Sequence, residues 1–386
     1  MPMSSNSSII FIFGIYAIIC LVVAIYFFAI CLGNTIYIHK NTKKPLLKNG
    51  PKVSVLLPAR NEEKNLENCL NKLVSQDYQN YDIFVLDDNS TDRTLEIALW
   101  FKKNHSDKVH VIQGKSLPAD WNGKPYAMHQ LVQAADGEIL LFTDVDTKHK
   151  KSSVSFAVTN LILNDVDMIS GYIHEEMETF GEKITVSSMF LLSALVVPLF
   201  LNGISKFNFF SNAIGQYIAV KADAFKKSGG YEVVKKVTTE DVFLARNMKK
   251  CGFKTLFIDI KNQCSCRMYE GYINSVHGIG KNLFDFLGKS APILFLVLSA
   301  VIIFLVIPPF FIYFAEGFPF WIKSSLVFSI NFQILTWFFL LYDRGNDIWI
   351  SILYPLIFLN IVIIGISSFC RTVSGKGFQW KGRTVS

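Results

Sequence analysis

Ile139-Leu140-Leu141-Phe142-Thr143-Asp144-Val145-Asp146 is the stretch that decides the fold of this chain. An apolar run of strand type ends here in two acidic residues that flank one valine. A short apolar run of this kind is typical of a buried strand in a parallel sheet. Two carboxylates at the end of such a strand can share one hard cation, Mg²⁺ or Mn²⁺, and leave positions for diphosphate oxygens. The cation would offset the charge on a leaving diphosphate.

Upstream of this stretch, apolar runs alternate with segments of helical spacing. The predicted strands cover residues 53–57, 83–86, 109–112 and 139–142, and the predicted helices include residues 62–74 and 126–135. This alternation predicts βαβ units and a mostly parallel α/β sheet. Because ligands of such sheets bind at the carboxyl ends of the strands, the acidic residues there are candidates for a site.

Two further acidic clusters follow the same logic. Asp87-Asp88-Asn89-Ser90-Thr91-Asp92 comes directly after the second predicted strand, where a carboxylate can accept hydrogen bonds from a nucleobase or ribose. The alternative is a simple turn and helix start, which the same residue types favour. Thr239-Glu240-Asp241 precedes a predicted helix. Acidic residues in a first turn can interact with the helix dipole alone, or one of them can serve as a catalytic base.

Four ordered motifs give the chain a family resemblance. Pro58-Ala59-Arg60-Asn61-Glu62-Glu63, the 87–92 cluster, Asp144-Val145-Asp146 and Thr239-Glu240-Asp241 resemble the pattern of family 2 inverting glycosyltransferases with the GT-A fold, over about residues 52–283. Three flanking segments are similar to a lipid-acceptor subgroup that contains diaponeurosporenoate glycosyltransferase of the staphyloxanthin pathway and hopene-associated glycosyltransferases. These segments are Asn122-Gly123-Lys124-Pro125-Tyr126-Ala127, Cys266-Arg267-Met268-Tyr269-Glu270-Gly271 and Trp380-Lys381-Gly382-Arg383.

The resemblance implies a role for each matching residue. The nucleotide-sugar would be bound by Asp87, Asp88, Lys124, Asp144, Arg60 and Glu62, with Lys124 meeting the diphosphate. The metal would be held by Asp146 and Asp144, and the catalytic pair would be Asp241, as the base, and Glu240. The acceptor or the diphosphate would be contacted by Gly215, Gln216 and Arg267. Met268 stands where the family often has a tryptophan after the arginine.

The implied function is inverting, metal-dependent transfer of a hexose from a UDP-sugar to a membrane lipid such as a carotenoid acid or a hopanoid. The alternatives are a glycosyl-diacylglycerol synthase, a processive polysaccharide synthase and, outside the enzymes, a membrane transporter. A transporter predicts ionisable residues inside its spans, and the apolar stretches 9–33, 291–314 and 348–370 contain none. No basic run of the kind that binds nucleic acid occurs, and no obligatory protein partner is evident.

The apolar residues predict membrane segments. The chain of 386 residues is 51% hydrophobic, carries 34 Phe and has a net charge of +7, and its apolar residues collect at both ends. Residues 9–33 are uncharged and long enough to span a membrane. Because no small-residue cleavage site follows them, they are expected to form an uncleaved anchor. The positive-inside rule then places the following domain in the cytosol of a multi-pass membrane protein. The basic residues behind this assignment are Lys40, Lys43, Lys44, Lys48 and Lys52.

The predicted organisation is an anchor over 1–34, a catalytic domain over 35–290, a membrane region over 291–370 and a basic tail over 371–386. Within the catalytic domain, residues 184–205 and 275–289 are expected to form interfacial helices. The C-terminal stretches 291–314, 320–342 and 348–370 can each span. Three spans place the tail outside whereas its charges place it inside, so Pro308-Pro309 or Pro355 is expected to break one of them.

Two remaining features have plain interpretations. The seven cysteines do not form a disulfide or zinc framework and fit a reducing compartment. His149 lies among Lys148, Lys150 and Lys151 and is expected on the solvated surface.

Overall fold

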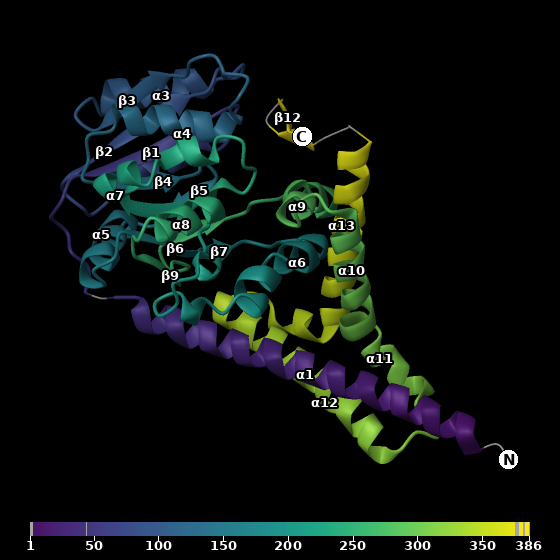
Figure 1. The fold of residues 1–386 in the computed structure, drawn as a ribbon. Helices are drawn as coiled ribbons and strands as arrows, with labels where there is room; N and C mark the ends of the chain where they lie inside the picture. The colour runs from purple at the N-terminus through teal and green to yellow at the C-terminus, as the bar shows by residue number, and fades with distance from the viewer. Residues whose placement is uncertain (1–2, 44, 375–377, 381–382, 386) are drawn as a thin grey trace. The chain divides into compact units, whose positions relative to one another are not determined.

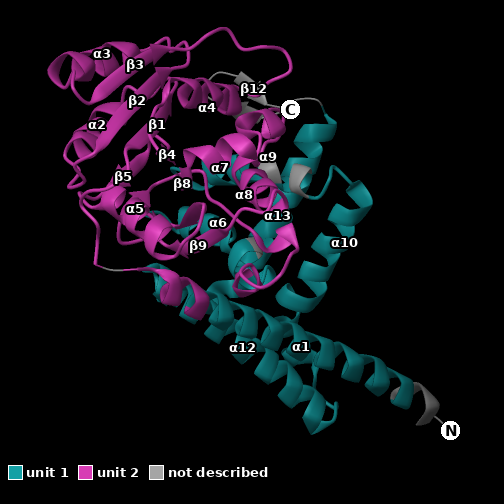
Figure 2. Cartoon of the chain, turned by 60° about the vertical axis from the view of Figure 1, so that its left-hand side comes forward, with its two compact units in different colours: residues 1–35, 177–198, 269–386 teal, residues 36–176, 199–268 magenta. Residues whose placement is uncertain are grey.

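The computed structural model describes residues 3–43, 45–374, 378–380 and 383–385. The chain divides into two compact units, which are coloured separately in Figure 2. Unit 1 comprises Met1–Thr35, Met177–Pro198 and Tyr269–Ser386, and unit 2 comprises Ile36–Glu176 and Leu199–Met268. Lys44 of the predicted basic flank and Lys376 and Lys381 of the predicted tail lie outside the described residues.

Unit 2 is built on a mostly parallel sheet. In the described part of the chain this sheet has seven strands in the order β3-β2-β1-β4-β8-β6-β9, and β1 to β4 lie side by side in Figure 1. β8 is antiparallel to β4 and β6, and the other pairs are parallel. The predicted α/β class is therefore confirmed. The strands are β1(Val53–Ala59), β2(Tyr81–Asp87), β3(Val109–Gln113), β4(Ile139–Thr143), β6(Met168–Tyr172), β8(Tyr217–Lys221) and β9(Thr255–Asp259).

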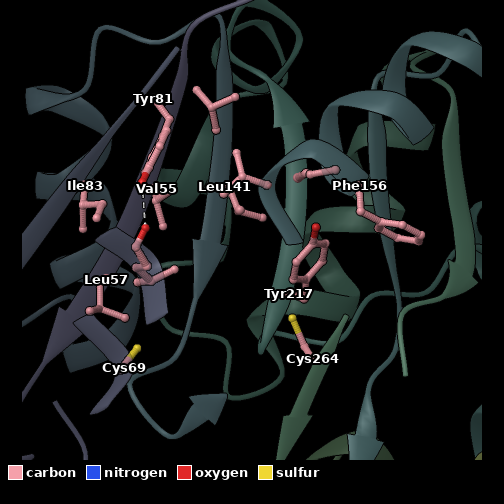
Figure 3. Packing of buried hydrophobic residues seen from close by; sticks show 14 of the residues in the cluster. Val55, Leu57, Cys69, Tyr81, Ile83, Leu141, Phe156, Tyr217 and Cys264 are labelled. Atoms are coloured by element: carbon pink, nitrogen blue, oxygen red, sulfur yellow. Dashed lines mark hydrogen bonds between the residues drawn. The ribbon is translucent and has the colours of Figure 1, made fainter. Parts of the chain in front are cut away.

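Helices cover both faces of this sheet, which explains why its strands are apolar along their whole length. On β1, Val53, Val55 and Leu57 pack in one core cluster, and Leu56 packs in a second cluster on the opposite face. Figure 3 shows part of the first cluster, where Val55, Leu57 and Leu141 come from adjacent strands. The covering helices are α2(Leu66–Val74), α3(Thr94–Asn104), α4(Gly123–Ala134), α5(Ser153–Leu163), α7(Ala222–Lys227) and α8(Glu240–Lys250).

β1 is longer than the predicted strand 53–57, because it continues through Pro58 to Ala59. Pairing of β1 with β4 ends at Leu56, so the proline lies beyond that ladder. A proline in a central strand would otherwise remove a ladder hydrogen bond.

A second, smaller sheet begins with the strand that follows β4 in the chain. Within the described residues its strand order is β5-β10-β7, formed by β5(Thr147–His149), β10(Cys264–Cys266) and β7(His174–Glu175). The register pairs Cys266 with Thr147 on one side and with Glu175 on the other. Since paired residues of neighbouring strands point to the same face, these three side chains share one face of the small sheet.

Unit 1 contains the apolar helices. Among the described residues, three helices are long and apolar enough to cross a membrane, Ser7–Asn41, Phe320–Arg344 and Ile348–Val373, and a fourth span exists if the bent pair Ala291–Val306 and Pro308–Phe314 is one span. That pair is bent by 43° at Pro308, where a break was predicted. The elements are α1(Met3–Asn41), α6(Phe180–Ser187), α9(Tyr272–Phe286), α10(Ala291–Val301), the π-helical η5(Ile302–Val306), α11(Pro308–Phe311), α12(Phe320–Arg344), the 3₁₀ turn η7(Ile348–Leu353), α13(Tyr354–Val373), β11(Phe378–Trp380) and β12(Arg383–Val385).

The stretch 184–205 is not one continuous helix. It contains the end of α6, the π-helical η1(Leu191–Val196) and the short 3₁₀ turn η2(Leu199–Leu201). Pro198 lies between the last two segments, where its missing N–H interrupts helical hydrogen bonding. In unit 1, Asn34 of α1 donates hydrogen bonds to the carbonyl oxygens of Ala194 (3.1 Å) and Val197 (2.8 Å), so a side-chain amide satisfies backbone groups of this irregular segment.

At Gly171, in the interior of unit 2, only glycine fits. A Cβ atom on Gly171 of β6 would lie 1.8 Å from the carbonyl oxygen of Ile258 on β9. We expect Gly171→Ala to force β6 and β9 apart and to cost about 3 kcal/mol or more of stability. Thermal unfolding of the purified protein should show an apparent Tm lower by at least about 5 °C. Gly203→Ala is the matched control, because a Cβ there meets nothing within 4 Å. Equal Tm values for the two variants would contradict this packing.

Candidate active site

The centre of the candidate site is the ammonium group of Lys124. This residue lies in the first turn of α4, and its Nζ is 2.8 Å from both carboxylate oxygens of Asp144, which follows β4. The same Nζ is 3.7 Å from Oε1 of Glu240, the first residue of α8. One cation therefore joins a strand end to the starts of two helices.

Asp241 is fixed beside this group by backbone hydrogen bonds. Its Oδ2 accepts from the N–H of Gly215 at 2.8 Å, and its Oδ1 accepts from the N–H of Val242 at 2.8 Å. Gly215 approaches closely because it has no side chain. A Cβ there would be 3.2 Å from Nζ of Lys124 and 3.5 Å from Oδ2 of Asp241. The structure thus brings together five of the predicted site residues, Lys124, Asp144, Gly215, Glu240 and Asp241.

The charged side chains of this group shift one another's pKa values. Burial alone would lower the pKa of Lys124, but the carboxylates of Asp144 and Glu240 outweigh it and raise the pKa above the usual value. Burial raises the pKa of Glu240 to about 7, against the opposing charge of Lys124. Burial also raises the pKa of Asp241, again opposed by Lys124. A carboxylate whose pKa is raised accepts a proton more readily, which suits a general base.

The loops after β1 and β2 are locked to each other. Arg60 donates through Nη1 to the backbone oxygens of Asp88 and Asn89. Oδ1 of Asn61 accepts from the N–H of Thr91 at 2.9 Å. Asn61 and Asn89 have φ of 51° and 55°, a left-handed conformation that asparagine tolerates better than most residues. These contacts place Arg60 with the predicted nucleotide-binding Asp87 and Asp88, both of which are buried.

Glu62 and Arg267 are further predicted residues that lie outside the Lys124 group. Oε2 of Glu62 accepts from Nδ2 of Asn65 at 3.0 Å, in the loop before α2. Arg267 directly follows β10 and Met268 follows it. The predicted roles of Glu62 toward the nucleotide-sugar and of Arg267 toward the acceptor or the diphosphate stay predictions.

A second buried cluster surrounds Asp146 and was not predicted. Glu175 and Thr147, on the shared face of the small sheet, are 7% and 1% exposed, and Gln216 is 3% exposed. Burial, followed by the charge of Asp146, raises the pKa of Glu175 to about 8. Asp146 also raises the pKa of the Cys266 thiol, after the larger effect of burial, so both groups lie near this carboxylate. The pairing of β10 with β5 and β7 brings Thr147, Cys266 and Glu175 to one face, and no local sequence signal marks Thr147 or Glu175.

His149 corrects the surface assignment made from its lysine neighbours. Its side chain is 3% exposed and bridges two hydroxyls. Its Nε2 is 2.8 Å from Oγ1 of Thr143, and its Nδ1 is 2.9 Å from Oγ of Ser153. Thr143 in turn donates to the carbonyl oxygen of Gln216 at 3.0 Å. A buried chain of hydrogen bonds therefore supports the end of β4, which Asp144 directly follows. The same chain holds the backbone of Gln216, the residue after Gly215.

The acidic residues suit a divalent cation that takes oxygen ligands. Among the described residues, no group of three or more His, Cys, Asp or Glu side chains is arranged to hold a metal ion. Asp144 and Asp146 are two carboxylates at a strand end, and substrate phosphates and water would complete the coordination. This donor set fits Mg²⁺ or Mn²⁺ and does not discriminate between them.

Comparison with known proteins identifies the class. Residues 54–229 match the model of the family described as glycosyl transferase family 2. The chain therefore carries a family 2 glycosyltransferase domain, and the protein is a glycosyltransferase, as its motifs predicted.

Particular relatives refine this class. The chain is 25% identical over 270 residues to the 4,4'-diaponeurosporenoate glycosyltransferase of Staphylococcus haemolyticus, covering 69% of this chain and 70% of the relative. It is 23% identical over 353 residues to the enzyme of the same name from Staphylococcus aureus (strain bovine RF122 / ET3-1), covering 90% of this chain and 92% of the relative. The solved structure of the mannosyltransferase PcManGT from Pyrobaculum calidifontis, in complex with GDP-Man and Mn²⁺, has a TM-score of 0.53 at 17% identity, and the match covers 92% of this chain and 99% of that one. This similarity shows a common fold.

The buried histidine makes stability depend on pH. Burial lowers the pKa of His149 from 6.5 to about 4. Between these values the unfolded chain binds a proton that the folded protein does not, so stability falls as pH decreases from about 6.5 towards 4. The loss approaches about 3 kcal/mol at the lower limit. We expect the apparent Tm to fall from pH 7 to pH 5.

His149→Asn should flatten this pH dependence while lowering the Tm at pH 7, because asparagine does not titrate but reaches fewer partners. His110→Asn serves as the control, since the His110 side chain is 42% exposed. An unchanged slope in His149→Asn would show that other groups cause the acid sensitivity.

Proposed function

We propose that the protein transfers a hexose from a UDP-sugar to a lipid acceptor, with inversion at the anomeric carbon. The observation that carries the proposal is the fixed position of Asp241, held by Gly215 next to the Lys124–Asp144 pair. The position that a Cβ atom of Gly215 would occupy is 3.2 Å from Nζ of Lys124 and 3.5 Å from Oδ2 of Asp241, so the glycine leaves open the space next to both the base and the cation. An inverting transfer needs these two groups, one for the acceptor proton and one for the leaving diphosphate.

The proposed reaction is a single displacement. The acceptor oxygen forms a bond to the anomeric carbon while the bond from that carbon to the diphosphate oxygen breaks. The acceptor proton goes to the carboxylate of Asp241, and UDP leaves with the bonding electron pair. Lys124 stabilises the negative charge that develops on the diphosphate. Glu240 keeps Lys124 in place and adds to the local negative charge.

The remaining site residues would bind the donor. Asp87 and Asp88 are proposed to accept hydrogen bonds from the uracil and ribose, on loops that Arg60 holds together. Glu62 precedes α2 near the same loops. Gln216 and Arg267 are proposed to contact the acceptor or the diphosphate. A Mg²⁺ or Mn²⁺ ion held by Asp144 and Asp146 would supply positive charge to the diphosphate.

A membrane lipid is the proposed acceptor, and the cytosolic side is the proposed location of the catalytic unit. Three apolar helices of spanning length support membrane attachment. The names of the relatives, 4,4'-diaponeurosporenoate glycosyltransferases, support a carotenoid acid as the acceptor class. Lysines that follow the first apolar helix support the orientation by the positive-inside rule.

Removal of the base tests the catalytic assignment. Asp241→Asn keeps a similar shape but cannot accept a proton, so we expect transfer to a hydroxyl lipid to fall about 10²–10⁴-fold. UDP release by the purified protein with a lipid extract measures the rate. Asp223→Asn, an exposed acidic residue in the first turn of α7, is the control and should keep normal turnover.

The same assay separates two acceptor chemistries. A carboxylic acid acceptor is already ionised near neutral pH and barely needs a base, so Asp241→Asn should then lose much less activity. Asp146→Ala should abolish turnover with either acceptor. Full turnover in Asp146→Ala would rule out the proposed metal-dependent transfer.

The orientation can be measured with one exposed thiol. Cys251, at the end of α8, is exposed, and Cys370 in α13 is the other exposed cysteine among the described residues. In a Cys370→Ser background, we expect a membrane-impermeant maleimide to label Cys251 only after the cells are permeabilised. Cys370→Ser with Cys251→Ser gives the background signal. Labelling of Cys251 in intact cells would place the catalytic unit outside and overturn the cytosolic assignment.

A further inference from the structure

The cluster around Glu175 contains polar groups that the fold itself does not use. Thr147, Cys266 and Glu175 are paired in register across the small sheet and share one face. The Gln216 side chain lies within reach of the Glu175 carboxyl and of the Cys266 thiol. Three strands and the segment before β8 therefore converge on one buried polar space beside Asp146.

Several atoms in this space have no hydrogen bond of good geometry to any described residue. They are Oγ1 of Thr147, Oε2 of Glu175, and both Nε2 and Oε1 of Gln216. Their side chains are more than nine-tenths buried. Leaving one such group unsatisfied costs roughly 1–3 kcal/mol, so four together in one place indicate something that binds them.

The position of the cluster indicates what that is. Glu175 pairs with Cys266, which pairs on its other side with Thr147, the residue after Asp146, and the charge of Asp146 acts on the Glu175 carboxyl group. The buried carboxyl group of Glu175, the partly buried carboxyl group of Asp146 and two further side-chain oxygens form an environment of hard oxygen atoms, which favours a divalent cation and its water. A sugar ring carries no positive charge, so a sugar alone would not offset the negative charge of two neighbouring carboxylates.

We propose that Glu175, with Thr147 and Gln216, supports the divalent cation that Asp146 would bind. Glu175 is a positioning residue, because it acts through Asp146 and does not itself touch the reacting atoms. Residues behind the direct ligands of a metal commonly change its affinity 10–100-fold. This inference rests on the proposed metal-dependent transfer and assigns it a residue that the sequence motifs do not include.

Metal affinity is the direct test. The full-length protein in detergent is titrated with Mn²⁺ in the presence of UDP, and free Mn²⁺ is followed by electron paramagnetic resonance. Glu175→Gln, which keeps the shape and removes the ionisable carboxyl group, should raise the Kd for Mn²⁺ about 10–100-fold. Glu176→Gln is the matched control and should leave the Kd unchanged, because Glu176 pairs with Lys148 and accepts from Ser265.

A second variant keeps the test decisive if Glu175→Gln does not fold. Thr147→Val has nearly the same shape and removes only the hydroxyl, and it should raise the Kd for Mn²⁺ several-fold. Mn²⁺ affinity within twofold of wild type in every folded variant would overturn the inference. So would an unchanged affinity accompanied by altered preference among UDP-sugars, because that result would assign the cluster to the sugar.

The wild-type protein separates this inference from the proposed function. If it binds Mn²⁺ with the expected dependence on Glu175 but releases no UDP with any lipid extract, the inference stands and the proposed transfer fails. If it releases UDP with lipid and Glu175→Gln binds Mn²⁺ normally, the transfer stands and the inference fails.

Discussion

The ion pair between Lys124 and Asp144 is the interaction on which the candidate active site depends. Both side chains are only 23% and 25% exposed, and pairing offsets the cost of removing each charge from water. The pair fixes the start of α4 against the end of β4, and Glu240 adds the start of α8. Asp241 then occupies its place because it is the next residue of that helix and because Gly215 holds it. A diphosphate approaching this centre meets a cation that is already oriented.

The sequence predicted the parts of unit 2 that depend on local pattern. The strands were recognised because both faces of the sheet are covered, which makes each strand an unbroken apolar run. The acidic residues were recognised because they follow those strands, and their roles came from the family resemblance. The antiparallel placement of β8 between β4 and β6 was not predicted, since strand order depends on contacts between segments far apart in the chain.

The positions of the residues that the prediction missed depend on pairing between strands that are far apart in the chain. Glu175 shares a face with Thr147, the residue after Asp146, only because β10 pairs with both β5 and β7. His149 was assigned to the surface from three lysine neighbours, yet along β5 its side chain and that of Thr147 point inward while Lys148 points outward. The alternation of a strand, with a period of two, carried more information than the local charge. The stretch 184–205 was expected to be one helix because it is apolar, and Pro198 and a π-helical turn divide it.

The strand order also constrains when unit 2 can be completed during synthesis. β6 pairs with β9 and β8, and residues 177–198, which belong to unit 1, lie between β6 and both partners in the chain. A nascent chain that has emerged only as far as β7 therefore presents β6 with neither neighbour. Unpaired strands of this kind are prone to aggregation and slow to fold. The sheet closes only after residue 259 has left the ribosome, so α1 is made long before the candidate active site is complete.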